Sequence, residues 1–163
     1  RATLPMEGRE RRLAYLQHAA LSSIMTETVP PPPEGFVPSP RGPYTTHNGP
    51  MFHRIGEGGS FDHAFFVLPR HCNSMGIVHG GMLATFLDGL LARAVFGSTG
   101  AQSVTLHLSM DFLSAARKGQ WVFGEAKVTR AAKEITFAEA RIHADGRDVL
   151  RGSGVFKKAG GRT

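Results

Sequence analysis

Residues 71–88 read HCNSMGIVHGGMLATFLD, and this stretch decides the interpretation of the chain. A polar turn with Asn73 and Gly76 leads into His79-Gly80-Gly81, and an apolar helical pattern that contains one carboxylate, Asp88, begins at once. Paired glycines let a ligand approach the backbone closely, and the first turn of a helix offers N–H groups without intrahelical partners. An aspartate inside an apolar helix is costly unless it is paired or functional. The combination predicts hydrolysis of an activated acyl group.

The pattern Asn73-x-x-Gly76-x-x-His79-Gly80-Gly81, followed by a helical Asp88, resembles the hotdog-fold acyl-CoA thioesterases of the phenylacetic-acid-pathway type, in the 4-hydroxybenzoyl-CoA thioesterase superfamily. The resemblance extends from about residue 49 to residue 158. It implies an α+β hotdog fold, in which an antiparallel sheet wraps around a central helix. It also implies hydrolysis of an acyl- or aryl-acyl-CoA to the free acid and CoA. No cofactor and no metal are expected, since coenzyme A enters as part of the substrate.

The same resemblance assigns roles to individual residues. Asp88 would act as general base or as nucleophile, and an ionised carboxylate can serve in either role. The Gly80 N–H would donate to the thioester oxygen, Asn73 would hold the attacking water or the carbonyl, and His79 would be auxiliary. Substrate contacts are predicted for Gly81, Thr105, Arg130 and Lys133, the last two with the CoA phosphates. Each of these residues also has a purely structural interpretation. The glycines could form a tight turn, Asn73 could be an ordinary turn residue, and His79 could only orient its neighbours. Thr105 could be an ordinary strand residue, and Arg130 and Lys133 could be solvated turn charges.

Hydrophobic periodicity predicts an extra N-terminal helix, two strands, one central helix and four strands. The predicted elements are a helix over 7–27 ended by prolines 30–33, strands over 51–55 and 61–68 with a turn at 56–59, a helix over 79–97 closed by Gly97, and strands over 102–112, 121–130, 135–143 and 149–156. The central helix is apolar over a wide arc, which indicates burial. Short turns between strands favour antiparallel pairing. We expect three parts: the N-terminal helix and Pro-rich linker (1–43), the hotdog domain (44–158) and a tail (159–163).

Two local patterns refine this outline. In residues 104–112 the even positions are apolar and the odd positions polar, which predicts a half-buried strand. On the central helix Asp88 shares a face with the small residues Ala84, Thr85 and Ala92. A stripe of small residues beside a carboxylate leaves room for a ligand or another backbone, although a helix edge emerging into solvent has the same pattern.

Composition excludes several classes of protein. A chain of 163 residues fits one domain, and the single Cys72 excludes an internal disulfide and fits a reducing compartment. No apolar run approaches the roughly 20 residues of a membrane span and no signal pattern is present, so we expect a cytoplasmic protein without a membrane partner. The net charge of +6 fits an anionic ligand such as CoA or a solvated surface. The basic residues are scattered along the chain, a distribution that does not indicate nucleic-acid binding. The spacing of His63, His71 and His79 is not that of a zinc site.

The resemblance further implies a homodimer or homotetramer with shared active sites, in which Asn73 and Gly80 come from one chain and Asp88 from the other. Pairing two sheets would also remove an open edge from each. Two other functions stay open: a non-catalytic acyl-CoA-binding hotdog protein, and a hotdog hydratase or dehydratase, whose His–carboxylate motifs are not found at matching positions. The preferred acyl group is not predicted. The residues Phe86, Phe96 and Phe112 could line a tunnel or belong to the core, and the Pro-rich segment could cap that tunnel.

Overall fold

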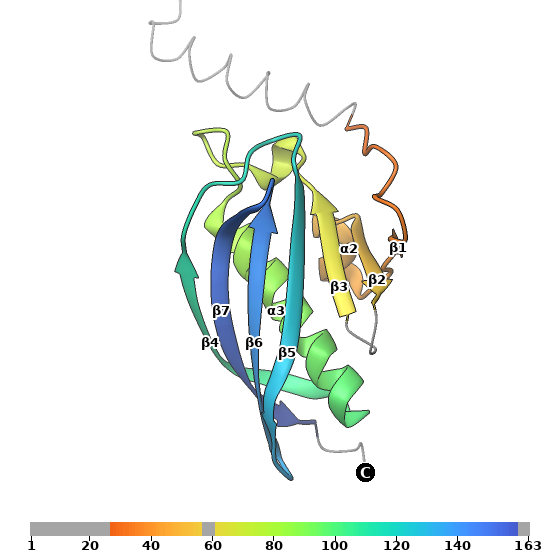
Figure 1. The fold of residues 1–163 in the computed structure, drawn as a ribbon, viewed down its shortest axis with the longest axis vertical. Coiled ribbons are helices and arrows are strands. Elements are labelled where there is room, and N and C mark those ends of the chain that lie inside the picture. Colours follow the sequence, from red (N-terminus) through yellow and green to blue (C-terminus); the bar gives the residue numbers. More distant parts are fainter. Residues whose placement is uncertain (1–26, 57–60, 160–163) are drawn as a thin grey trace, which may run out of the picture.

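The computed structural model describes residues 27–56 and 61–159 and shows an antiparallel sheet wrapped around one long helix (Figure 1). The predicted α+β hotdog arrangement is therefore confirmed. The predicted helix over residues 7–27 and the turn over residues 56–59 fall almost wholly outside the described residues.

The central helix α3 (Gly80–Thr99) begins one residue later than predicted and ends two residues further on. Its apolar side chains are buried in the concave face of the sheet: Met82, Leu83, Phe86, Leu87, Leu90, Leu91 and Val95. The predicted closure at Gly97 is wrong, because Gly100 adopts the left-handed conformation (φ 67°) that ends the helix. The helix is long and apolar enough to span a membrane by composition, but that character follows from its place inside the sheet.

Seven antiparallel strands form the sheet in the order β1-β2-β3-β5-β6-β7-β4. Their bounds are β1 Val37–Pro38, β2 Met51–Ile55, β3 Phe61–Phe66, β4 Ser103–Phe112, β5 Trp121–Ala131, β6 Ile135–Ala144 and β7 Arg147–Lys158. The tight turn between β6 and β7 consists of Asp145 and Gly146, both with positive φ, so the two strands extend further toward each other than the predicted ranges 135–143 and 149–156.

Glycines on the inner face of the sheet let α3 approach closely. A Cβ atom at Gly124 would lie 2.6 Å from Leu90 and 2.9 Å from Phe86, and one at Gly152 would lie 2.6 Å from Leu87. Distances this short do not occur between real side chains. The absence of side chains at these two positions sets the distance between the helix and the sheet, and hence the position of Asp88.

The strand β4 lies at one edge of the sheet and pairs only with β7. The predicted half-buried face is wrong over part of its length, because Val104, Leu106 and Phe112 are 52%, 55% and 55% exposed. The register shifts between Thr105 and His107, so that Leu106 lies in a bulge that breaks the alternation of faces. Beyond the bulge, the apolar residues Leu108 and Met110 do pack partly against the core.

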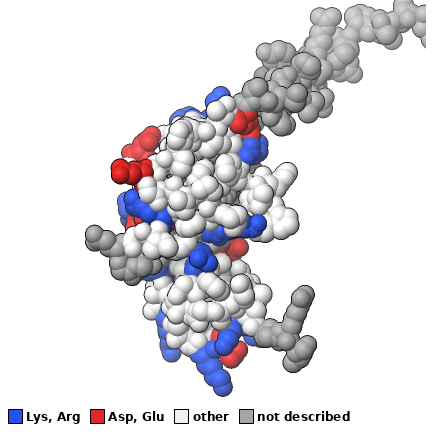
Figure 2. Space-filling view, turned by 90° about the vertical axis from the view of Figure 1, so that its right-hand side faces the viewer, with Lys and Arg blue, Asp and Glu red and all other residues white. Residues whose placement is uncertain are grey.

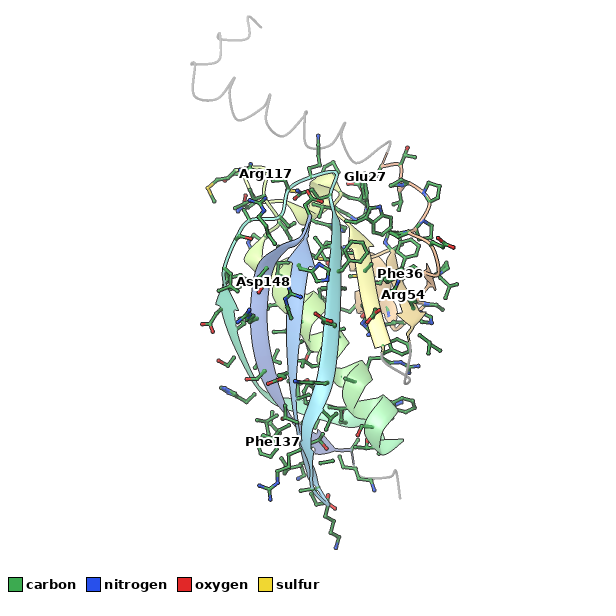
Figure 3. The ribbon with its side chains drawn as sticks, viewed as in Figure 1. Glu27, Phe36, Arg54, Arg117, Phe137 and Asp148 are labelled. Carbon is green, nitrogen blue, oxygen red and sulfur yellow. The ribbon has the colours of Figure 1, made fainter. Side chains whose placement is uncertain are left out.

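The segment before β2 is more structured than a linker. The strand β1 adds to the sheet beside β2, and a short helix α2 (Pro43–Asn48) follows it. Phe36 is buried in a second small cluster with Phe52 and Ala64, and the Arg54 guanidinium lies 4.9 Å from the centre of its ring (Figure 3). The domain boundary predicted between residues 43 and 44 stays a prediction, but β1 belongs to the same sheet as the hotdog strands.

Candidate active site

The Asp88 carboxylate lies half-buried on α3 and accepts a hydrogen bond from the Thr105 hydroxyl of β4, with 2.7 Å between Thr105 Oγ1 and Asp88 Oδ1. Two predicted site residues from separate elements are therefore in contact. The bond holds one carboxylate oxygen in place. Among the described residues no hydrogen bond is made to the other oxygen, Oδ2, so it can accept a proton from water or attack a carbonyl carbon.

The start of α3 is organised by His79. This residue is the N-cap, and its Nδ1 accepts a hydrogen bond of 2.9 Å from the Gly81 N–H. An accepting Nδ1 places the ring proton of neutral His79 on Nε2. The Gly81 N–H is thus occupied within the chain, whereas the Gly80 N–H meets no acceptor in the part of the chain that the structure describes. Of the two glycines, Gly80 offers the free donor at the positive end of the helix dipole.

Asn73 sets the turn that leads to the helix. Its side-chain Oδ1 accepts from the backbone N–H groups of Met75 (2.9 Å) and Ile77 (3.4 Å), and its own N–H donates to the Ile77 carbonyl. The oxygen therefore has the structural role expected of a turn asparagine. Its Nδ2 donates no hydrogen bond within the described ranges, so the amide N–H groups are what Asn73 can offer to a substrate or a water.

Within one chain the predicted residues form separate groups. Gly80 and Asp88 are eight residues apart on one helix, which corresponds to about 12 Å along its axis. A single carbonyl carbon cannot contact both. The structure therefore brings Asp88 into contact with Thr105, whereas Asn73, His79 and Gly80 lie along the segment that leads into the start of α3. It does not bring the two groups together in one chain.

Arg130 and Lys133 form a third group at the turn between β5 and β6, near the C-terminal end of α3 (Figure 1). Both are exposed, and Lys133 lines a cavity of about 200 Å³ together with Thr99, Gln102 and Lys158. On the face shown in Figure 2, lysines and arginines occur in small separate groups, with uncharged surface between them. No continuous basic band is visible on that face.

Sequence reasoning missed Arg41, which anchors the N-terminal segment beside Asp88. Its Nη1 donates to the Gly89 carbonyl at 2.9 Å, and its Nη2 lies 2.6 Å from Nε2 of the buried His63. Burial, with the Arg41 charge second, lowers the pKa of His63 to about 3. His63 is therefore neutral and can accept a hydrogen bond from Arg41. No local pattern around Arg41 signals a partner in β3 or in α3.

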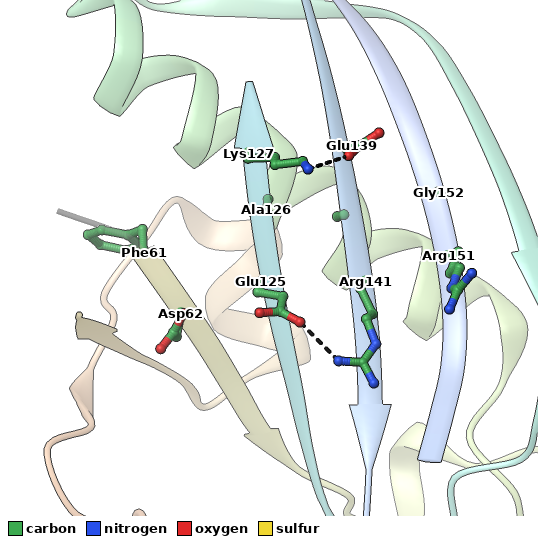
Figure 4. A pocket seen from close by; sticks show the side chains of 10 residues that line it. Phe61, Asp62, Glu125, Ala126, Lys127, Glu139, Arg141, Arg151 and Gly152 are labelled. Atoms are coloured by element: carbon green, nitrogen blue, oxygen red, sulfur yellow. Dashed lines mark hydrogen bonds and ion pairs between the residues drawn. The ribbon is translucent and has the colours of Figure 1, made fainter. Parts of the chain in front are cut away.

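A shallow groove of about 670 Å³ lies on the outer face of the sheet (Figure 4), and its lining contains none of the predicted site residues. Its charged side chains pair with one another: Lys127 Nζ lies 2.9 Å from Glu139 Oε1, and Arg141 lies 3.2 Å from Glu125 Oε1. Arg141 and Arg151 both also bind Asp148, which lowers the pKa of that carboxyl. Because these charges are already paired, the groove has the character of a solvated sheet face.

Comparison with known proteins agrees with this geometry. A sequence profile described as the thioesterase superfamily matches residues 75–150. The protein PA0474 of Pseudomonas aeruginosa, described as a candidate esterase, is 37% identical over 127 residues, which cover 76% of this chain and 95% of that protein. Acyl-coenzyme A thioesterase 13 of Mus musculus is 29% identical over 77 residues, 47% of this chain and 55% of that protein.

A solved structure shows the same fold. A candidate thioesterase related to phenylacetic acid degradation, from Ralstonia eutropha, superposes with a TM-score of 0.64 at 25% identity, covering 72% of this chain and 92% of that one. The fold and these relatives define a hotdog hydrolase. The chain belongs to the thioesterase superfamily, and the predicted family and enzyme class, a thioester hydrolase, are confirmed.

Proposed function

We propose that the chain hydrolyses acyl-CoA thioesters to a free acid and CoA, at a site shared between two copies of the chain. The observation that carries the proposal is the hydrogen bond between Thr105 and Asp88, which orients a half-buried carboxylate on an otherwise apolar helix. The name of the murine relative, an acyl-coenzyme A thioesterase, supports CoA thioesters as the substrate.

In the proposed site Asn73 and Gly80 come from one copy, and Asp88 with Thr105 from the other. The Gly80 N–H donates to the thioester oxygen, where negative charge grows in the tetrahedral intermediate. The helix N-terminus adds a favourable field at the same place. The free amide group of Asn73 holds the water or the carbonyl, and His79 fixes the helix start through its cap.

Asp88 can act in two ways, and both stay open. As a general base it takes a proton from water while the water oxygen bonds to the carbonyl carbon; the C–S bond then breaks, and CoA leaves as a thiolate that takes up a proton. As a nucleophile its carboxylate oxygen bonds to the carbonyl carbon and expels the CoA thiolate, and water then hydrolyses the mixed anhydride.

The exposed edge strand supports the shared site. Val104, Leu106 and Phe112 of β4 and the following Leu113 are all more than half exposed. An uncovered strand edge with exposed apolar residues is a surface that proteins bury by pairing. A second copy placed there, in a homodimer or homotetramer, would cover the strand that holds Asp88 through Thr105.

The CoA nucleotide is proposed to lie at Arg130 and Lys133. These residues lie at the far end of α3 from Gly80, and the long pantetheine arm of CoA separates its phosphates from the thioester. Lys158 lines the same small cavity as Lys133, and Glu134 in that lining offsets one of the two positive charges. A cytoplasmic location, expected from the single Cys72, stays a prediction.

Thiol release from a panel of acyl-CoAs of different chain length, followed with a thiol reagent, tests the proposed function. We expect release of CoA with saturation kinetics for at least one member of the panel. Saturable binding of the same acyl-CoAs without thiol release would instead identify a non-catalytic binder on this fold and overturn the proposal.

A further inference from the structure

A cavity of about 310 Å³ lies between α2 and the start of α3. The face of α3 that lines it lies next to Asp88. The lining of the cavity includes Tyr44 of α2 together with His79, Gly81 and Thr85 around the first turns of α3. Thr85 precedes Asp88 by three residues and therefore lies beside it on the helix surface. Gly81, the neighbour of the proposed donor Gly80, lines the cavity, whose volume is at the lower end of the usual range for small-ligand sites.

The buried polar residue of this lining is His71, which is only 3% exposed. Its Nδ1 accepts a hydrogen bond of 3.1 Å from the Leu68 N–H, so the ring proton of the neutral side chain lies on Nε2. This N–H has no hydrogen-bond partner among the described residues. The carbonyls of Asn48 and Gly49 lie close enough to oppose the shift in its pKa, but burial dominates and lowers that pKa to about 4.

A buried N–H without an acceptor is destabilising, so an acceptor supplied by a ligand would be favourable there. His79 presents a second imidazole N–H to the same cavity, because its Nδ1 is likewise occupied by a backbone N–H. The two histidines are linked through the backbone, since the His79 N–H donates to the His71 carbonyl at 2.8 Å. Two imidazole rings, each with its Nδ1 occupied by a backbone N–H, therefore line one cavity.

The cavity carries little net charge. Arg70 lines it, but its guanidinium contacts the Glu27 carboxylate and donates to the Gly49 carbonyl. At the open side the Tyr44 hydroxyl lies 3.0 Å from the Thr85 hydroxyl, which donates to the Gly81 carbonyl. A neutral lining with free N–H donors favours a neutral acceptor oxygen over a carboxylate, whose desolvation would not be compensated by an unpaired positive charge.

We infer that this cavity receives the acyl group of the substrate, and that the His71 N–H selects short acyl groups whose tail carries a neutral acceptor oxygen, a hydroxyl or a ketone. The inference rests on the proposed function, because it places the thioester at Gly80. It makes His71 a residue that determines specificity, separate from the residues of the hydrolytic step.

Steady-state kinetics on four CoA thioesters of equal chain length tests the inference. Hexanoyl-CoA is compared with 5-oxohexanoyl-CoA, 6-hydroxyhexanoyl-CoA and the anionic adipoyl-CoA. The wild-type protein should show a higher kcat/KM for at least one neutral oxygenated substrate than for hexanoyl-CoA and adipoyl-CoA. Equal values for all four, or a preference for adipoyl-CoA, would overturn the inference and leave the proposed function standing. No hydrolysis of any of the four would overturn the inference alone, because the proposed function is decided by the wider acyl-CoA panel of different chain lengths.

Two substitutions distinguish the contributions of the two ring nitrogens of His71. His71→Asn keeps an acceptor near the Nδ1 position for the Leu68 N–H but removes the Nε2 donor, and it should reduce the oxygenated-to-hexanoyl ratio of kcat/KM roughly five- to tenfold. His71→Gln keeps a donor near the Nε2 position and should retain more of the ratio. His143→Asn, on β6 outside this cavity, is the matched control and should keep the wild-type ratio. An unchanged ratio in His71→Asn contradicts the inference.

Circular dichroism and thermal melting show whether each variant folds. If His71→Asn does not fold, product inhibition of the wild-type protein decides the question. The acid 6-hydroxyhexanoate or 5-oxohexanoate should inhibit at a lower concentration than hexanoate, and three equal inhibition constants would overturn the inference.

Discussion

The two halves of the proposed site are held in very different ways. At the start of α3 the side-chain acceptors are bonded to neighbours close in sequence: Asn73 Oδ1 to Met75 and Ile77, and His79 Nδ1 to Gly81. Asp88 depends instead on one hydrogen bond from Thr105, on an exposed strand at the edge of the sheet. The first half is preorganised by the chain itself, whereas the second is incomplete until something covers β4. This difference is what a shared site between two copies would require.

The largest expected effect comes from the second half. Asp88→Asn keeps the size of the side chain and can still accept from Thr105, but it removes the negative charge that either proposed route needs. We expect kcat to fall by at least 10²-fold, the usual scale for loss of a catalytic group. Thiol release measures the rate, and circular dichroism checks the fold. Glu139→Gln, on the outer sheet face, is the control; more than a tenth of the wild-type kcat in folded Asp88→Asn would contradict the assignment.

Mixing two inactive variants tests whether the halves come from different chains. Asn73→Asp keeps the Oδ1 acceptor of the turn but removes the amide donor, and Asp88→Asn removes the charge. If each site uses Asn73 of one copy and Asp88 of the other, a heterodimer has one intact site. Random exchange of subunits at a 1:1 ratio should then restore roughly a quarter of the wild-type activity. No recovery, with exchange demonstrated by mass spectrometry of differently tagged chains, would place both halves in one chain.

The same contrast explains what could be predicted from the sequence. The start of α3 and the position of Asp88 follow from local patterns, because glycine pairs, N-caps and helical periodicity act within a few residues. The exposure of the apolar residues of β4 could not be predicted. The same alternation of apolar and polar residues occurs in a buried strand and in an edge strand that a second chain covers. The role of Arg41 could not be predicted for a related reason, because its partners His63 and Gly89 are 22 and 48 residues away in the sequence.

Two buried histidines, His63 on β3 and His71 before α3, give the stability of the protein a distinctive pH dependence. Burial lowers the pKa of His63 to about 3 and that of His71 to about 4, whereas an unfolded chain has values near 6.5. Above pH 6.5 both states are neutral and stability is unaffected. As pH falls below 6.5 the unfolded state binds protons that the native state does not, so the free energy of unfolding decreases until the folded pKa values are reached. Urea unfolding at pH 7, 6 and 5 should show this decline, and a shallower one in His63→Asn. Parallel pH profiles for the two proteins would contradict it.

Thr105→Val measures how much the single hydrogen bond at the edge strand contributes. Valine matches threonine in shape but lacks the hydroxyl, so Asp88 loses the donor that orients it. We expect kcat to fall roughly tenfold, the size of one charge-assisted hydrogen bond, while Thr105→Ser retains most of the rate. The comparison of the two variants isolates the hydroxyl from the packing of the strand. Equal rates in the valine, serine and wild-type proteins would show that the edge strand is not needed to orient the carboxylate.

The smallest expected effect lies outside both halves, at Arg130 and Lys133. Exposed charges contribute little each and are screened by salt, with a Debye length of roughly 8 Å at physiological ionic strength. Arg130→Ala combined with Lys133→Ala should therefore raise KM for an acyl-CoA a few-fold at low salt and change kcat little, because the CoA phosphates are unchanged in the transition state. The increase should shrink in 1 M salt. On an acyl-pantetheine thioester, which lacks the nucleotide, the double variant should match the wild-type protein. Equal losses on both substrates would assign these residues to the fold or the chemistry, and place the nucleotide elsewhere on the chain or on the second copy.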